Sequence, residues 1–187
     1  REDGLEDVHE HSADGIRSRF DALRGAFAAF RPEIHFAAKS CGNLHILRML
    51  VGMGSGIDVV SGGELERAWL AGCRMERVAF AGVGKTEGEI RAAIDGRFSP
   101  LRGSDGGART GAGDPADRGT IGLINIESVE EFARVDRIAR ELGRAVRVAL
   151  RVNPDVDART HPYTTTGRRR NKFGIELSAA EGAYTRA

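Results

Sequence analysis

The sequence contains few cysteines, few aromatic residues and almost no net charge. Of its 187 residues two are cysteines and 6% are aromatic, and the formal net charge is +1 at pH 7. Two cysteines are too few for a disulfide framework and are read as small buried residues, so we expect a cytoplasmic protein. The balanced charge gives no electrostatic reason to expect nucleic acid as a partner.

Long apolar runs are missing as well. No stretch approaches the roughly 18 apolar residues that a membrane-spanning helix needs, and the polar start is not typical of a signal peptide. Residues 1–11 are polar throughout. His9 and His11 resemble a metal-binding pair, but no third ligand stands nearby, so we expect a solvated segment and no metal site. The first residue is not methionine and Ala187 ends an apparent helix, so we expect a fragment of a longer protein.

Strand-like and helix-like apolar segments alternate along the chain with short turns between them. The expected strands are 34–39, 57–60, 78–81, 121–126 and 146–152. The expected helices are 16–30, 44–53, 65–71, 86–94, 129–142 and one after 178. This order predicts parallel strands joined by helical crossovers, an α/β fold. A doubly wound sheet and a (β/α)8 barrel both fit, and a barrel of about 250 residues would be incomplete here.

One long segment interrupts this alternation. Residues 96–119 are rich in glycine, arginine, aspartate and proline and contain little apolar material. Such a composition cannot bury a core, so we expect a long exposed or disordered loop.

Lys39 stands at the carboxyl end of the first expected strand. Buried strands seldom finish on a lysine without a reason, and α/β folds place their chemistry at the carboxyl ends of parallel strands. A partly desolvated amine at this position can form a Schiff base, although a surface lysine fits the spacing equally well. Asp58 occupies the equivalent position one βα unit later, and Arg151 lies within an apolar strand further along.

Residues 79–86, Ala-Phe-Ala-Gly-Val-Gly-Lys-Thr, come close to a phosphate-binding loop that follows a strand and opens a helix. The first position holds Ala79 where the pattern has glycine. No later apolar strand ends in an aspartate that would hold magnesium. A nucleotide-binding module built on Lys85 is therefore the less favoured hypothesis.

Three stretches in order resemble the fold type III pyridoxal-phosphate decarboxylases, the family that includes ornithine, diaminopimelate and arginine decarboxylases. They are Phe-Ala-Ala-Lys-Ser-Cys-Gly-Asn at 36–43, Gly-Ile-Asp-Val-Val-Ser-Gly-Gly-Glu-Leu at 56–65 and Ala-Gly-Val-Gly-Lys-Thr at 81–86. Later stretches are similar to the members that act on diaminopimelate. These are residues 150–156, 160–163, 166–167 and 171–175, so that the resemblance covers roughly residues 12–177.

The resemblance implies an alanine-racemase-like (β/α)8 TIM barrel, of which residues 12–187 form an incomplete part with the loop at 96–119. A C-terminal β domain would be absent from this chain. Lys39 would carry pyridoxal 5′-phosphate covalently as a Schiff base. The resemblance also implies cofactor-binding roles for Asp58, Arg151 and Lys172, and a place in a substrate-side loop for His161.

The function implied is a lyase of lysine biosynthesis that decarboxylates meso-2,6-diaminopimelate to L-lysine and CO2. The His161-Pro162-Tyr163 stretch is the reason for preferring that substrate. The family also implies a small amino-acid substrate and a homodimer with shared active sites. An ornithine or arginine decarboxylase of the same family and a non-catalytic homologue that binds pyridoxal phosphate stay open, and the fragment alone is expected to be inactive.

Overall fold

The computed structural model describes residues 12–96, 119–153 and 174–185. It divides into two compact units, Arg1–Ile34 and His35–Ala187. The predictions made for residues 1–11, for nearly all of the 96–119 loop, and for His161 and Lys172 lie outside the described residues. Within the described ranges, no helix combines the length and apolar character needed to cross a membrane.

The first unit contains α1, Ala13–Ala26, and the short 3-10 helix η1, Ala28–Phe30. Ser12 caps α1 by accepting the Gly15 N–H at 3.3 Å. The expected single helix over 16–30 is therefore too long, because regular α-helix ends before Phe27. Phe20 is the buried member of the apolar stripe, whereas Leu23, Phe27 and Phe30 are exposed.

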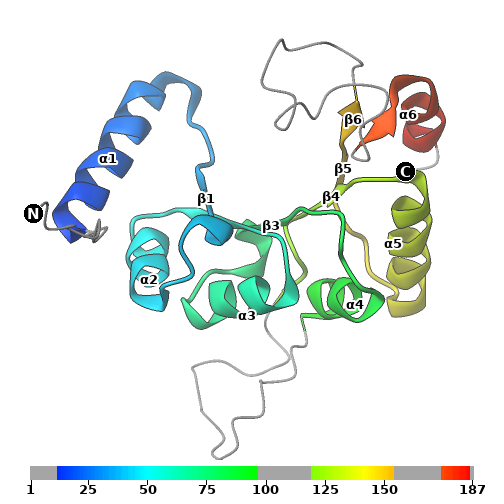
Figure 1. The fold of residues 1–187 in the computed structure, drawn as a ribbon, viewed down its shortest axis with the longest axis horizontal. Coiled ribbons are helices and arrows are strands. Elements are labelled where there is room, and N and C mark those ends of the chain that lie inside the picture. Colours follow the sequence, from blue (N-terminus) through cyan, green and yellow to red (C-terminus); the bar gives the residue numbers. More distant parts are fainter. Residues whose placement is uncertain (1–11, 97–118, 154–173, 186–187) are drawn as a thin grey trace, which may run out of the picture. The chain divides into compact units, whose positions relative to one another are not determined.

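The second unit is built on a parallel five-stranded sheet. Its strands are β1 (His35–Ala37), β2 (Gly56–Val59), β3 (Val78–Phe80), β4 (Leu123–Ile126) and β5 (Val148–Leu150), in that spatial order. The intervening helices are η2 (Ala38–Ser40), α2 (Leu44–Gly52), α3 (Gly62–Leu70), η3 (Met75–Arg77), α4 (Glu87–Asp95) and α5 (Val129–Leu142). A doubly wound sheet reverses its strand order at a switch point, whereas this sheet follows the sequence throughout. The sheet is therefore part of a barrel wall (Figure 1).

The chain after β5 differs from the expectation. The strand expected at 146–152 is split, with Arg151 between β5 and a second strand, β6 (Val152–Asn153). β6 pairs in parallel with β7 (Ile175–Glu176), and α6 (Leu177–Tyr184) follows. The charged Arg151 therefore marks a break in the apolar strand rather than a position inside it.

The two faces of the sheet have different side chains, because successive residues of a strand point in opposite directions. The face under the helices carries Ile57, Val59, Val78, Phe80, Ile124 and Ile126, all at most 1% exposed. Each such side chain contributes about 1.5–3 kcal/mol on burial, so this layer is the core of the unit. The opposite face carries small and polar residues: in register, Asp58 lies between Ala37 and Ala79.

Three helices begin with the same local pattern, a hydroxyl residue followed three positions later by glutamate. Ser61, Thr86 and Ser128 cap α3, α4 and α5, each by accepting the N–H of that glutamate. Glu89 does more than close its own helix. Its carboxylate accepts the Thr86 N–H at 2.9 Å and the Gly62 N–H of α3 at 2.6 Å. A Cβ on Gly62 would lie 2.8 Å from Glu89 Cγ, so this approach requires glycine.

Candidate active site

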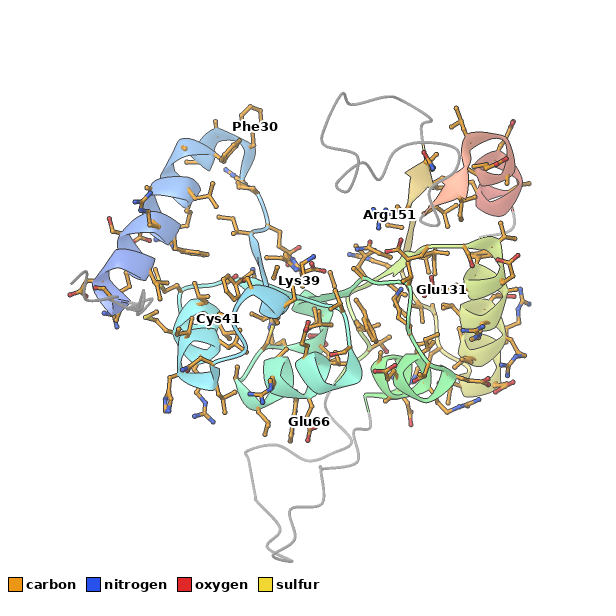
Figure 2. All side chains as sticks on the ribbon, in the orientation of Figure 1. Phe30, Lys39, Cys41, Glu66, Glu131 and Arg151 are labelled. Atoms are coloured by element: carbon orange, nitrogen blue, oxygen red, sulfur yellow. The ribbon has the colours of Figure 1, made fainter. Side chains whose placement is uncertain are left out.

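Five residues lie at or just beyond the carboxyl ends of the five strands. Because the strands are parallel and follow the sequence order, these ends share one edge of the sheet. The residues are Lys39 after β1, Asp58 in β2, Gly82 after β3, Glu127 after β4 and Arg151 after β5. Figure 2 shows Lys39 and Arg151 on the side of the sheet away from α3 and α4. The edge thus gathers three of the predicted site residues: Lys39, Asp58 and Arg151.

Lys39 lies one tight turn beyond its strand rather than on the strand itself. β1 ends at Ala37, and Lys39 is the middle residue of η2. Ser40 Oγ donates to the Ala37 carbonyl at 2.7 Å and the Cys41 N–H donates to the Ala38 carbonyl at 3.1 Å, which closes the turn. Ala38 is buried while Lys39 is exposed. The turn therefore anchors the backbone and presents the amine to solvent at the edge.

Asp58 is half-buried on the small-residue face of the sheet. Burial raises the pKa of its carboxyl above the ordinary 3.8, while the positive charges of Lys39 and His35 act in the opposite direction. The charge of Lys39 thus acts directly on Asp58. Lys39 and Asp58 stand near the carboxyl ends of two neighbouring strands, so the amine lowers the cost of ionising the carboxyl without an ion pair between them being needed.

His35 is a neighbour of this pair that the sequence pattern did not single out. It is paired with Gly56 in the β1–β2 register. A Cβ on Gly56 would lie 2.6 Å from His35 Cε1 and 2.6 Å from the Arg77 carbonyl oxygen. The imidazole therefore packs over the backbone of β2, two residues before Asp58. Strand alternation could have found it, since His35 and Ala37 share a face.

Arg151 is joined to the same edge by a carboxylate that the sequence pattern also missed. Glu127 Oε2 accepts from Arg151 Nη1 at 3.0 Å, and Glu127 Oε1 accepts the Gly82 N–H at 3.2 Å. Gly82 has a φ of +98°, a conformation that glycine adopts without strain. The Glu127 side chain is 6% exposed and that of Arg151 is 44% exposed, so the acid is internal while the guanidinium reaches solvent.

Lys85, the lysine of the phosphate-loop-like motif, is internal. Its ammonium donates to the Gly82 carbonyl at 2.5 Å, the Asn125 carbonyl at 2.8 Å and Glu131 Oε1 at 2.6 Å. An ammonium has three N–H donors, and these three acceptors use them all. The side chain has no exposed surface. Lys85 is therefore not available to hold a phosphate, and the nucleotide-binding hypothesis loses its central residue.

The two cysteines differ in their surroundings. Cys73 is buried, and burial raises the pKa of its thiol to about 11, so the unreactive protonated form dominates at neutral pH. Cys41 is only partly buried, two residues after Lys39. The expectation that both are small buried residues is confirmed for Cys73 and wrong for Cys41, because the turn after β1 brings Cys41 toward the surface.

Comparison with known families gives a match over nearly the whole chain. Residues 13–187 match the model described as pyridoxal-dependent decarboxylase, pyridoxal binding domain. The chain belongs to this family. The match begins one residue after the Ser12 cap and includes the turn that carries Lys39.

Individual relatives of this decarboxylase family cover 95% of the chain. Diaminopimelate decarboxylase of Neisseria meningitidis serogroup B is 38% identical over 177 residues, which are 95% of this chain and 37% of the relative. The Vibrio cholerae diaminopimelate decarboxylase is 41% identical over 177 residues, again 95% and 37%. This chain therefore spans well under half the length of these relatives.

Among solved structures, diaminopimelate decarboxylase from Helicobacter pylori in complex with L-lysine superimposes with a TM-score of 0.75. It is 33% identical, and the match covers 96% of this chain and 41% of that one. The fold is thus that of the decarboxylase barrels, and this chain spans less than half of the matched structure. The resemblance found in the motifs and the incomplete barrel are both confirmed.

The edge residues suit the group that gives this decarboxylase family its name. Pyridoxal phosphate carries an aldehyde, which an exposed primary amine such as Lys39 can bind covalently. Asp58 lies between two alanines in register, Ala37 and Ala79, so the sheet face around the carboxylate has small side chains. Arg151 adds a permanently charged guanidinium that suits anionic groups. An amine, a carboxylate and a guanidinium on a face of small side chains fit the cofactor.

Proposed function

We propose that the full-length protein is a pyridoxal-phosphate-dependent decarboxylase that converts meso-2,6-diaminopimelate to L-lysine and CO2. The observation that carries the proposal is the exposed Lys39 amine on the turn after β1, electrostatically coupled to Asp58 at the same edge of the sheet. Support for the substrate comes from relatives that are 38–41% identical and are named diaminopimelate decarboxylase.

When bound, pyridoxal phosphate supplies an electron-withdrawing ring that accepts the electrons of the bond to the departing carboxylate. The protein residues do the rest. Lys39 anchors the cofactor through its Nζ atom and must give up a proton to do so. Asp58, at the end of the neighbouring strand, would favour a positive charge on that nitrogen through its own negative charge. Arg151 binds an anionic group from the far side of the edge.

We also propose that Lys172 contributes to cofactor binding and that His161 belongs to a substrate-side loop, as the motifs of residues 160–175 suggest. Residues 12–187 would form the first part of the cofactor-binding barrel. The full-length protein would be a cytoplasmic homodimer with shared active sites. A mass measurement in solution tests the dimer, and a monomer at working concentration would contradict it.

The anchor is tested by trapping the cofactor. Full-length protein is incubated with pyridoxal phosphate, reduced with borohydride, digested and examined by mass spectrometry. We expect a pyridoxyl group on the peptide that contains Lys39. A pyridoxyl group confined to another lysine, or none at all, would contradict the assignment of the anchor.

The substrate is tested by CO2 release. Diaminopimelate, ornithine and arginine are supplied at equal concentrations to the same loaded protein. We expect diaminopimelate to give the highest kcat/KM. A higher value for ornithine or arginine would favour that decarboxylase, and cofactor binding without CO2 release from any of the three would favour a non-catalytic homologue.

A further inference from the structure

Glu127 links two loops at the edge of the barrel. One carboxylate oxygen accepts from Arg151 at 3.0 Å and the other accepts the Gly82 N–H at 3.2 Å. With 6% of its side chain exposed, Glu127 lies behind Arg151, which is 44% exposed. A buried carboxylate of this kind holds a guanidinium through a charged hydrogen bond, which is stronger than a neutral one.

A second ion pair holds Glu127 in place. Glu131 accepts the Glu127 N–H at 2.7 Å with one oxygen and the Lys85 ammonium at 2.6 Å with the other. Lys85 in turn donates to the carbonyl of Gly82, whose N–H is held by Glu127. The N–H of Gly82 is therefore bound by Glu127, and its carbonyl is bound through Lys85 to Glu131. Figure 2 labels Glu131 and Arg151 on the same side of the unit, with Glu131 on the first turn of α5.

We infer that Glu127 is a positioning residue, which fixes the Arg151 guanidinium for the cofactor or substrate, and that the buried Lys85–Glu131 pair fixes Glu127. The inference rests on the proposed function. It gives the phosphate-loop-like motif a role: Lys85 acts inside the protein on the loops that orient Arg151. Glu127 would act through Arg151, which its carboxylate binds, rather than on the cofactor or substrate directly.

The inference is tested with Glu127→Gln in the full-length protein. Glutamine has one carbonyl oxygen, which can still accept the Gly82 N–H, but its amide nitrogen then faces Arg151 donor to donor. We expect the dissociation constant for pyridoxal phosphate to rise, and kcat/KM to fall, by about 10- to 100-fold. Cofactor affinity is measured by absorbance titration of the cofactor-free protein.

A double-mutant cycle separates positioning from general damage. If Glu127 acts through Arg151, then Glu127→Gln changes kcat/KM by less than about threefold once Arg151→Ala is present. The matched control is Glu87→Gln. Glu87 accepts from Arg137 at 2.6 Å on the exposed surface of α4, so the control removes the same kind of charge away from the edge. The control should leave both measurements unchanged.

The outcomes are distinguishable. A Glu127→Gln protein that matches Glu87→Gln, or that adds its full loss to that of Arg151→Ala, overturns the inference. If Glu127→Gln does not fold, then Glu127→Asp replaces it, because the shorter side chain withdraws from Arg151 while keeping its charge. Wild-type cofactor affinity and kcat/KM in that variant overturn the inference as well. A wild-type protein that binds no pyridoxal phosphate would overturn the proposed function, and the inference with it.

Discussion

Lys39 and Lys85 both follow a strand of the same parallel sheet, and sequence motifs mark both as ligand-binding candidates. The structure separates them. Lys39 is exposed on a turn and interacts electrostatically with Asp58. Lys85 has no exposed side-chain surface, and three acceptors occupy its ammonium. A lysine that reacts must be accessible to its ligand and must be able to lose its proton. A lysine that holds loops together keeps its proton and is enclosed by its acceptors.

The largest expected effect is the loss of activity in Lys39→Ala. Without the amine the cofactor has no covalent anchor, so CO2 release from diaminopimelate should fall by at least about a thousandfold. Because Lys39 is exposed, the free energy of unfolding in urea should change by less than about 0.5 kcal/mol. Activity within tenfold of the wild type would show that the anchor lies elsewhere.

Lys85→Met should have the opposite profile. Removing the cation leaves the Glu131 carboxylate charged, 9% exposed and without its partner. Loss of one member of a buried pair costs about 3–5 kcal/mol, measured as the free energy of unfolding of the cofactor-free protein. The double variant Lys85→Met/Glu131→Gln should recover part of that loss, since glutamine carries no charge. Lys39→Ala is the matched control for removing a lysine.

The nucleotide-binding hypothesis gives the reverse expectation. It requires that Lys85→Ala abolish ligand binding while Lys39→Ala is harmless. If Lys85→Met retained full stability and lost only a nucleotide ligand, then the contrast between the two lysines drawn from the structure would be wrong.

A smaller effect is expected for Asp58→Asn. Burial raises the pKa of Asp58, so the folded protein takes up a proton on this carboxyl more readily than the unfolded chain does. Above the folded-state pKa the ionised carboxylate therefore lowers the free energy of unfolding. Below 3.8 the carboxyl is protonated in both the folded and the unfolded state, so this loss of stability disappears. Asp58→Asn should unfold at a higher temperature than wild type at pH 7, by a margin that shrinks as the pH falls toward 3.8.

The same variant should lose about tenfold in kcat/KM, because the negative charge that favours a positive charge on the Lys39 nitrogen is removed. Asp136→Asn on the exposed side of α5 is the matched control, and it should show neither change. A stability gain at pH 7 that persists unchanged at pH 4 would contradict the argument from burial.

Much of the fold follows from the sequence because the apolar periods are strong. The helix 129–142 is confirmed at both ends, where Ser128 caps it and Gly143 closes it with a positive φ. Four of the five strands are predicted in place but too long, the strand predicted at 57–60 is shifted by one residue, and Arg151 splits the last one. Strand ends depend on where a side chain finds its partner, and Glu127, the partner of Arg151, lies 24 residues earlier in the chain.

The site is predictable only in part for a related reason. Lys39, Asp58 and Arg151 follow from their positions at strand ends and from their motifs. Glu127 and Glu131 were missed, although the Ser-x-x-Glu pattern at 128–131 marks a helix start. The pattern predicts only that Glu131 folds back on its own helix start. One of its oxygens does so by accepting the Glu127 N–H, but the other binds Lys85, 46 positions away in sequence. The cation that pairs with a buried acid depends on which strands are neighbours in the sheet. The apolar periodicity of the sequence contains no information on that order.

The carboxylate of Glu89 has a consequence for how such a chain is assembled during synthesis. It closes α4 and also binds the Gly62 N–H at the start of α3, so α3 obtains this acceptor only after α4 has emerged. Two other contacts also join a loop to the unit that follows it. Arg67 of α3 donates to the carbonyl of Gly42, which precedes α2, and Glu127 accepts the N–H of Gly82. In these three cases the loop of one βα unit is completed by the next. During synthesis, each of these three loops would therefore obtain its closing hydrogen bond only after the following unit has been made.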